Sequence, residues 1–209
     1  MKNVLVVGTG TIGEPLIGLL SDHKKQLGID KVKFFKRTPL TDEKGKIESL
    51  IRKGGELVST DEVLSDFKSL GFEDIEDVEK SYSDCQVIID CTPKGNENWN
   101  NIYANLDSSK RFLAQGSEHG FGEFYAWGIN NSVFNESNRY LIASCNTHNM
   151  ASIINTFVIN QNRKLYKGRF VCLRRANDVS QDTSFTPSPT ITIHDDQNYG
   201  THHARDVSE

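Results

Sequence analysis

Short apolar runs alternate with helix-spaced apolar residues over the first forty positions of the chain. The run Asn3–Val7 is continuous and rich in valine, which predicts a strand buried on both faces. A second strand is expected over Val32–Phe35. Between the two strands, apolar residues recur at helical spacing, at Ile12, Leu16, Leu19 and Leu20. This order predicts a βαβ unit.

Further apolar runs continue the alternation. Strands are expected over Val87–Ile89, Arg111–Ala114 and Tyr140–Ala143. Strands that alternate with helical segments indicate an α/β fold with a mostly parallel, doubly wound sheet.

The region between the second and third expected strands is more polar. Residues 37–55 predict a loop or a weak helix. Ser59 and Glu62 then have the spacing of a capping box at a helix start, and Gly71 is a stop signal for that helix.

The pattern changes after Cys145. A helix is expected to begin near Asn146, with an apolar stripe formed by Met150, Ile153, Ile154, Phe157 and Val158. Phe170–Leu173 predicts a strand, and residues 176–200 are polar with two prolines, which is typical of a long surface loop. We therefore expect a first domain over residues 1–144 and part of a second over residues 145–209.

Composition narrows the class of protein. The 209 residues include 24 Lys and Arg against 28 Asp and Glu, a formal net charge of −4 that gives no reason to expect nucleic acid or an anionic membrane as partner. No apolar run approaches the roughly 18 residues that span a bilayer, and the N-terminus lacks a signal-peptide pattern. Four cysteines occur without CxxC spacing. We expect a reduced, cytoplasmic chain with no metal site.

A glycine-rich motif follows the first strand. Gly8-Thr9-Gly10-Thr11-Ile12-Gly13 matches GxGxxG, in which the first Gly8 permits a tight turn, Gly10 lets backbone approach a pyrophosphate and Gly13 permits close helix packing. The alternative is an ordinary glycine-rich turn. Because the motif lies between an expected strand and an expected helix, we predict dinucleotide binding.

The second strand ends in Lys36, Arg37 and Thr38. A site for NAD usually has an acidic residue about 20 residues beyond the glycines, to accept from the ribose hydroxyls. Two cations and a hydroxyl suit the 2′-phosphate of NADP instead, so we predict NADP as the preferred cofactor and NAD as the second. The alternative is a solvated basic loop.

Cys145 lies at an expected strand-to-helix junction, in Ser144-Cys145-Asn146-Thr147. A helix N-terminus stabilises a thiolate, the form of cysteine that attacks an aldehyde carbon. The alternative is a buried, unreactive thiol. The other three cysteines, Cys85, Cys91 and Cys172, occur in or beside apolar strands and are interpreted as core residues.

Two further motifs lie towards the C-terminus. His202-His203 could supply a general base for a nearby thiolate, and the alternative is a polar tail. Arg174-Arg175 ends the expected strand, where arginine suits a phosphate or a cofactor, and the alternative is a solvated pair.

Taken in order, the motifs resemble a known family. They are GTGTIG, CTPKG (91–95), QGSE (115–118), SCNT (144–147), RRA (174–176) and HHARDV (202–207). Together they resemble archaeal-type (type II) glyceraldehyde-3-phosphate dehydrogenase, and the resemblance runs along the whole chain. It implies a Rossmann-type domain followed by part of an α+β catalytic domain, in a cytoplasmic homotetramer.

The resemblance also implies a reaction and its residues. Cys145 would add to the aldehyde of glyceraldehyde 3-phosphate, His202 would take the hydroxyl proton as hydride leaves, and inorganic phosphate would release an acyl phosphate. Thr11, Ile12, Gly116 and Arg175 would contact the nucleotide. The substrate would be surrounded by Ser144, Asn146, Thr147, His202 and His203, with Thr147 as a phosphate ligand.

Two departures from the family pattern keep alternatives open. The family has a second threonine where this chain has His148, which alters the expected phosphate pocket. Family members also continue well past the HHARDV-like segment, so we expect a truncated second domain with apolar surface left exposed. The alternatives are a semialdehyde dehydrogenase with the same chemistry, and a nucleotide-binding fragment without catalysis.

Overall fold

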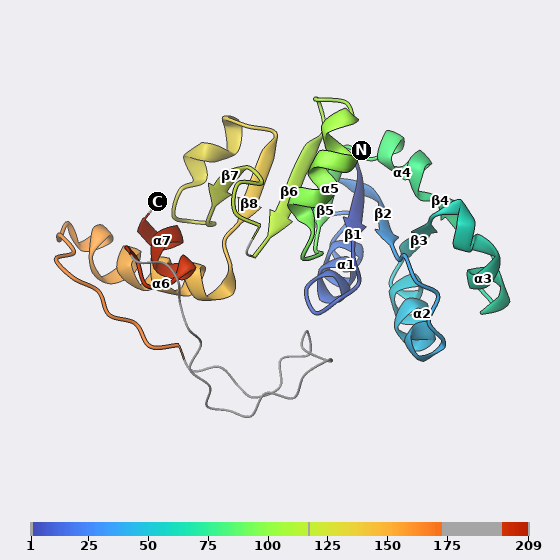
Figure 1. The fold of residues 1–209 in the computed structure, drawn as a ribbon, viewed down its shortest axis with the longest axis horizontal. Helices are drawn as coiled ribbons and strands as arrows, with labels where there is room; N and C mark the ends of the chain where they lie inside the picture. Colours follow the sequence, from blue (N-terminus) through green and yellow to red (C-terminus); the bar gives the residue numbers. More distant parts are fainter. Residues whose placement is uncertain (1, 117, 173–197, 209) are drawn as a thin grey trace.

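The computed structural model describes residues 2–116, 118–172 and 198–208. Within that part of the chain, a single parallel sheet organises the fold (Figure 1). Its strands are β1 (Lys2–Val7), β2 (Ile29–Phe35), β3 (Gly55–Ser59), β4 (Glu76–Asp77), β5 (Val87–Asp90), β6 (Arg111–Gln115), β7 (Glu123–Tyr125) and β8 (Arg139–Ile142). They lie in the order β4-β3-β2-β1-β5-β6-β8-β7, and every pair is parallel.

Helices connect these strands. The α-helices are α1 (Gly13–Asp22), α2 (Lys44–Arg52), α3 (Leu64–Ser69), α4 (Val78–Asp84), α5 (Gly95–Asn101), α6 (Cys145–Phe157) and α7 (His202–Ser208). Short 3₁₀ turns are η1 (Thr41–Glu43), η2 (Asp61–Val63), η3 (Tyr103–Asn105), η4 (Asn131–Asn135) and η5 (Ile159–Gln161).

The two faces of the sheet are covered by different helices, which divides the core into two layers. In β1, Val4 and Val6 face a layer that includes Ile17 of α1 and Ile47 of α2. Their neighbours Leu5 and Val7 face the opposite layer, which includes side chains of α4 and η3. Because both faces are buried, the strand is apolar throughout, as the sequence predicts. The α/β, doubly wound Rossmann-type fold is thereby confirmed.

The strand order places a switch point beside β1. The chain moves outward from β1 through β2 and β3 to β4, then returns to pair β5 with the other side of β1 and moves outward again. The carboxyl ends of β1 and β5 therefore lie side by side at one edge of the sheet. From β1 the chain continues towards β2, and from β5 it continues towards β6 on the opposite side. In open α/β sheets, ligands bind at such a point.

The apolar spacing predicted for the first helix is confirmed in part, because Leu16 and Leu20 pack against the core. The helix forms, but Ile12 and Leu19 are 46% and 57% exposed, whereas Ile17 and Gly18 are buried. The helix packs on the sheet through Ile17, with Leu16 and Leu20 against the same core layer, whereas Gly18 lies against the side chain of Lys53.

The capping box predicted at Ser59 is also wrong. Ser59 ends β3, a strand that the sequence pattern did not reveal, and its hydroxyl donates to the carbonyl oxygen of Lys36 at 2.7 Å. Of the loop or weak helix predicted for residues 37–55, the helix is present as α2. The stop signal at Gly71 is confirmed, since this residue has φ +94° and its N–H donates to Lys68 O at 2.8 Å.

The region after residue 144 matches the sequence prediction in part. The helix is present as α6, and Met150 is buried, but Ile153 and Phe157 of the expected stripe are exposed. Residues 170–172 are not a strand, and Phe170 and Val171 are exposed. Leu173, Arg174 and Arg175, with most of the expected 176–200 loop, lie outside the described residues.

None of the helices in the described ranges is both long and apolar enough to cross a lipid bilayer.

A buried lysine of β2 is neutralised by a glutamate of the edge strand β4, across the intervening strand β3. The side chain of Lys33 is 3% exposed and forms an ion pair with Glu76, which also accepts from Lys80 at 2.6 Å and from Ser81 at 3.2 Å. Burial opposes ionisation of Glu76, but hydrogen bonds from Lys33 and then Lys80 outweigh it and lower its pKa to about 2. The ion pair between Lys33 and Glu76 thus fixes the short strand β4 and compensates a lysine charge that would be costly to bury alone.

We predict that Glu76→Gln lowers the free energy of unfolding at neutral pH by about 2 kcal/mol, because it leaves the Lys33 charge poorly compensated. Since the folded pKa of Glu76 lies below its ordinary value of 4.5, the stabilisation is complete above pH 4.5 and is lost as the pH falls towards 2. Urea unfolding of both proteins at neutral and acidic pH measures the effect.

The matched control is Glu56→Gln, which removes an exposed ion pair with Lys31 on the same strand β2. Exposed pairs contribute below about 1 kcal/mol, so this variant should remain close to the parent. Equal destabilisation by the two substitutions, or a difference for Glu76→Gln that persists at pH 2, would contradict the prediction.

Candidate active site

The glycine motif forms a tight turn between β1 and α1. Gly8 has φ +94°, and its N–H donates to Phe35 O at the end of β2 at 3.3 Å. A Cβ on Gly13 would lie 2.0 Å from the carbonyl oxygen of Gly8, so this position accepts no side chain. A Cβ on Gly8 would meet Thr92 Cγ2 at 3.0 Å. The first and last glycines are therefore needed by the turn itself.

The middle of the motif is open. A Cβ on Gly10 would have no neighbour within 4 Å, and Thr11 and Ile12 are exposed. Ile12, the N-cap residue of α1, offers no side-chain cap to the first N–H groups of the helix. Uncapped N–H groups beside an open backbone surface fit the pyrophosphate of a dinucleotide.

The basic segment after β2 lies next to this turn. Arg37 and Thr38 are exposed, as a ligand contact requires. Lys36 forms an ion pair with Glu43, which also accepts from Lys46 at 2.5 Å. Lys46 in turn donates to Thr9 O at 3.3 Å. Sequence reasoning missed Glu43 and Lys46, whose signal was the charged run around residue 43.

Gly116 follows β6 at the same edge of the sheet. It has φ +77°, and its N–H donates to Ile142 O of β8 at 3.3 Å. The following loop is fixed by Glu118, whose Oε2 accepts from Asn96 N at 2.8 Å at the start of α5. The strands are parallel, so Gly116 and the glycine turn lie at the carboxyl edge of one sheet. Ser117 lies outside the described residues.

Cys145 is the first residue of α6, immediately after β8. Ser144 caps the helix by accepting from Thr147 N at 3.3 Å. The side chain of Cys145 is exposed, with Sγ 4.0 Å from Asn146 Oδ1. The exposed sulfur therefore lies at a helix N-terminus, where the macrodipole favours negative charge.

The other cysteines differ in their surroundings. Burial raises the pKa of the Cys85 thiol to about 11 and that of Cys91 to about 12. Cys85 lies before β5 and Cys91 directly after it, and both pack in the core, as predicted. The prediction that Cys172 is a core residue is wrong, because Cys172 is exposed in an irregular segment.

The histidine pair on α7 meets the start of α6. His203 Nδ1 lies 3.2 Å from both Ser144 Oγ and Thr147 Oγ1. Its other nitrogen lies 3.4 Å from Asn146 Nδ2. The ring of His202 is 3.9 Å from that of His203, centroid to centroid. The fold thus brings together residues that are almost sixty positions apart in the sequence.

His202 lines a cavity of about 170 Å³ together with Gly116. The cavity is completed by His119 and Leu141 and by Arg205 and Asp206 of α7. Asp206 is buried and accepts from Arg205 at 3.2 Å. Gly116 and His202, predicted separately as nucleotide and catalytic residues, therefore share one cavity.

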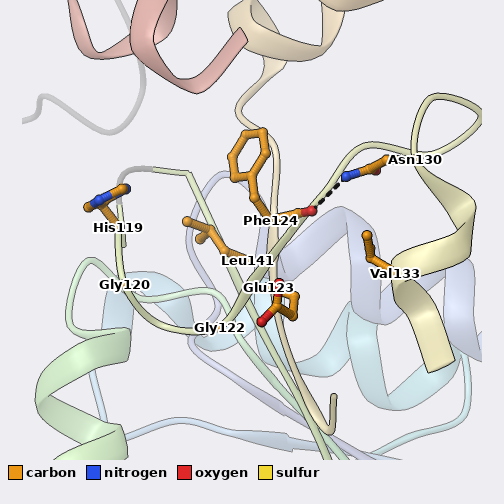
Figure 2. Close-up of a pocket in the computed structure, with 8 residues that line it drawn as sticks. All are labelled: His119, Gly120, Gly122, Glu123, Phe124, Asn130, Val133 and Leu141. Atoms are coloured by element: carbon orange, nitrogen blue, oxygen red, sulfur yellow. Dashed lines mark hydrogen bonds between the residues drawn. The ribbon is translucent and has the colours of Figure 1, made fainter. Parts of the chain in front are cut away.

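His119 was missed by sequence reasoning, although it follows Gly116 by three positions and shares its loop. It also lines a second cavity of about 320 Å³ beside β7 and β8. Figure 2 shows Phe124 and Leu141 in this cavity, with Asn130 Nδ2 donating to Phe124 O at 2.8 Å. Leu141 lines both cavities, so the two lie next to each other.

His148 and Arg175 are the remaining positions that the sequence predicted for the site. His148 Nε2 donates to Trp127 O at 3.1 Å, so this ring nitrogen is already engaged. Arg175 lies outside the described residues. Among the residues that are described, no group of three or more His, Cys, Asp or Glu side chains could hold a metal ion.

The curated relatives of this chain include two glyceraldehyde-3-phosphate dehydrogenases. A glyceraldehyde-3-phosphate dehydrogenase from Sulfolobus acidocaldarius is 29% identical, over 98% of this chain and 57% of that protein. One from Methanobrevibacter smithii is 27% identical, over 87% of this chain and 52% of that protein. The chain is thus similar to these dehydrogenases along most of its length, and it spans about half the length of these relatives. No family model matches the chain.

Solved structures are less similar. Aspartate semialdehyde dehydrogenase II from Vibrio cholerae has a TM-score of 0.45 at 13% identity, over 76% of this chain and 48% of that one. Haloferax mediterranei glucose dehydrogenase, solved with NADP, zinc and gluconolactone, has a TM-score of 0.39 at 17% identity, over 68% and 36%. Likeness at this level carries no argument about function.

Gly10, which has space for a side chain, and Gly13, which has none, should respond differently to substitution by alanine. Gly10→Ala adds a methyl group where the fold leaves space, so it should leave the melting temperature unchanged but weaken dinucleotide binding by about tenfold. Gly13→Ala should instead destabilise the fold, because its Cβ collides with Gly8 O. Nucleotide titration and thermal unfolding separate the two effects.

Gly45→Ala is the matched control, since it adds a methyl group in open space on α2. It should leave the affinity for nucleotide unchanged. Unaltered nucleotide affinity in Gly10→Ala would contradict the assignment of the turn.

Cys145 should be alkylated by iodoacetamide near neutral pH about tenfold faster than Cys172, because its exposed Sγ lies at the N-terminus of α6, where the helix macrodipole favours an attacking anion. Cys172 is the matched control because it is exposed but lies outside any helix. Cys85 and Cys91 should remain unmodified in the folded protein. Mass spectrometry of peptides over a time course measures all four rates, and equal rates for Cys145 and Cys172 would contradict thiolate stabilisation.

Proposed function

We propose that this chain carries the cofactor-binding and nucleophile-bearing part of a phosphorylating glyceraldehyde-3-phosphate dehydrogenase of the archaeal type, with NADP as preferred cofactor. The observation that carries the proposal is the contact of His203 on α7 with Ser144, Asn146 and Thr147, the residues that flank Cys145, at the carboxyl edge of the sheet that also holds the glycine turn. Sequence similarity to two curated dehydrogenases of that name supports it.

The glycine turn would hold the dinucleotide. The pyrophosphate fits the uncapped N-terminus of α1, and the open surface at Gly10 permits its close approach. Thr11, Ile12 and Gly116 lie along the same edge of the sheet and would contact the nucleotide. When bound, the nicotinamide supplies the acceptor for the hydride that leaves the substrate.

Cys145 would act as the nucleophile. Its thiolate adds to the aldehyde carbon, which forms a carbon–sulfur bond and a hemithioacetal hydroxyl after protonation. Loss of the hydroxyl proton to a base and of the hydride to the cofactor converts this adduct to a thioester. Inorganic phosphate then attacks the thioester carbon, which yields an acyl phosphate and restores the thiolate.

The two histidines would have different roles. Both ring nitrogens of His203 are engaged by side chains of Ser144, Asn146 and Thr147, so this ring is suited to orient substrate and helix terminus. His202 instead lines the cavity shared with Gly116, the residue that would contact the nucleotide. This difference supports His202 as the base that takes the hydroxyl proton.

The phosphate groups would be held near the start of α6. Thr147 is buried, with its hydroxyl 2.9 Å from that of Ser144 and 3.2 Å from His203 Nδ1, so a phosphate on this hydroxyl would have to replace these contacts. A helix N-terminus favours an anion in the same position.

Turnover tests the proposal. With glyceraldehyde 3-phosphate, NADP⁺ and inorganic phosphate, we expect NADPH absorbance to rise, to depend on phosphate and to be absent in Cys145→Ser. Glyceraldehyde 3-phosphate should also protect Cys145 from iodoacetamide, which reports substrate binding without turnover.

Two other outcomes would overturn the proposal. Turnover or protection by aspartate semialdehyde but not by glyceraldehyde 3-phosphate would identify a semialdehyde dehydrogenase. Nucleotide binding without turnover or protection by either aldehyde would identify a binding fragment without catalysis.

A further inference from the structure

Three charged side chains form a cluster beside the glycine turn. Lys36 follows β2, Glu43 ends η1 and Lys46 lies in the first turn of α2. Glu43 accepts from both lysines, one to each carboxylate oxygen. The side chains of Lys36, Glu43 and Lys46 are 12%, 21% and 26% exposed. The cluster is therefore a half-buried part of the fold rather than a solvated ion pair.

The cluster is fixed to the nucleotide turn and to the sheet. Lys46 donates to Thr9 O, inside the glycine motif, at 3.3 Å. The backbone of Lys36 is held by β3, because its N–H donates to Val58 O at 3.1 Å and its carbonyl accepts from Ser59 at 2.7 Å. The lysines are thus positioned at the place where the adenosine ribose of a dinucleotide meets the end of the second strand.

Glu43 is ionised at neutral pH. Burial opposes its ionisation, but hydrogen bonds from Lys36 and then Lys46 outweigh burial and hold the pKa of Glu43 below its ordinary value. Two lysines and one carboxylate leave a net charge of +1, to which the exposed Arg37 adds another. The field at this edge is positive but is reduced by a carboxylate from the chain itself.

We propose that Glu43 sets the cofactor specificity of the dinucleotide site by occupying the lysine pair that would otherwise bind the 2′-phosphate of NADP. The proposal rests on the dinucleotide binding proposed above. The phosphate and Glu43 compete for Lys36 and Lys46, so the binding of NADP must displace a carboxylate, whereas the binding of NAD need not. Glu43 thereby weakens a preference for NADP that the basic residues alone would make strong.

The experiment compares the nucleotide affinities of Glu43→Gln and Lys46→Ala with those of the parent chain. The probes are NADPH and NADH, together with 2′,5′-ADP and 5′-AMP, which differ only by the 2′-phosphate. Glu43→Gln should tighten the binding of NADPH and 2′,5′-ADP by about tenfold and leave NADH and 5′-AMP unchanged. Lys46→Ala should weaken the binding of NADPH and 2′,5′-ADP by about the same factor.

Lys44→Ala is the matched control, because Lys44 begins the same helix but pairs with Glu48 in an exposed pair. It should change none of the four affinities. Circular dichroism identifies a variant that does not fold, and the other variant then decides the proposal.

Other outcomes are distinguishable. If Glu43→Gln weakens NADH and 5′-AMP, Glu43 accepts from the ribose hydroxyls and the proposal is wrong. If the parent binds nucleotides but neither variant alters the ratio of NADPH to NADH affinity, the specificity role is overturned while dinucleotide binding stands. If the parent binds none of the four probes, both proposals fail.

Discussion

One buried carboxylate fixes the part of the sheet on which the rest depends. Asp90 ends β5 beside Val7 of β1, and it accepts from Thr92 N at 2.8 Å and Thr92 Oγ1 at 2.6 Å. Asn98 and Tyr103 donate to its second oxygen at 2.7 and 2.8 Å. A buried carboxylate is costly unless such donors surround it, so it selects one path for the chain after β5. That path places Thr92 against Gly8. The turn after β5 and the glycine turn after β1 thereby restrict each other's conformation.

Structural features that depend only on residues adjacent in the sequence could be predicted from it. The run Asn3–Val7 is apolar at successive positions, because both faces of β1 are buried, and the glycine turn follows it directly. The same holds for the junction at Ser144, where the residue that ends one segment also caps the next helix through Thr147 N. In both places the local pattern and the tertiary fold require the same residues, and the predictions agree with the structure.

Features created by tertiary contacts could not be predicted in this way. β3 contains only Leu57 and Val58 as large apolar residues, and it is a strand because β2 offers a parallel partner and the Lys36 backbone binds Ser59. Local spacing therefore assigned Ser59 to a helix cap. The meeting of His203 with the start of α6 is likewise a contact across more than fifty residues. The sequence marked both segments through their motifs, but periodicity carries no information about the distance between them.

The charged residues after β2 show why a sequence motif alone does not define the electrostatics of a binding site. After β2 the sequence presents Lys36 and Arg37, and a count of cations predicts a strong anion site. In the fold, Glu43 lies only seven residues later and neutralises one of the two lysines that it binds. The second lysine, Lys46, comes from α2 and was not counted at all. The electrostatics of the edge are therefore set by which side chains the turn of η1 brings back to β2, and not by the basic residues that follow the strand.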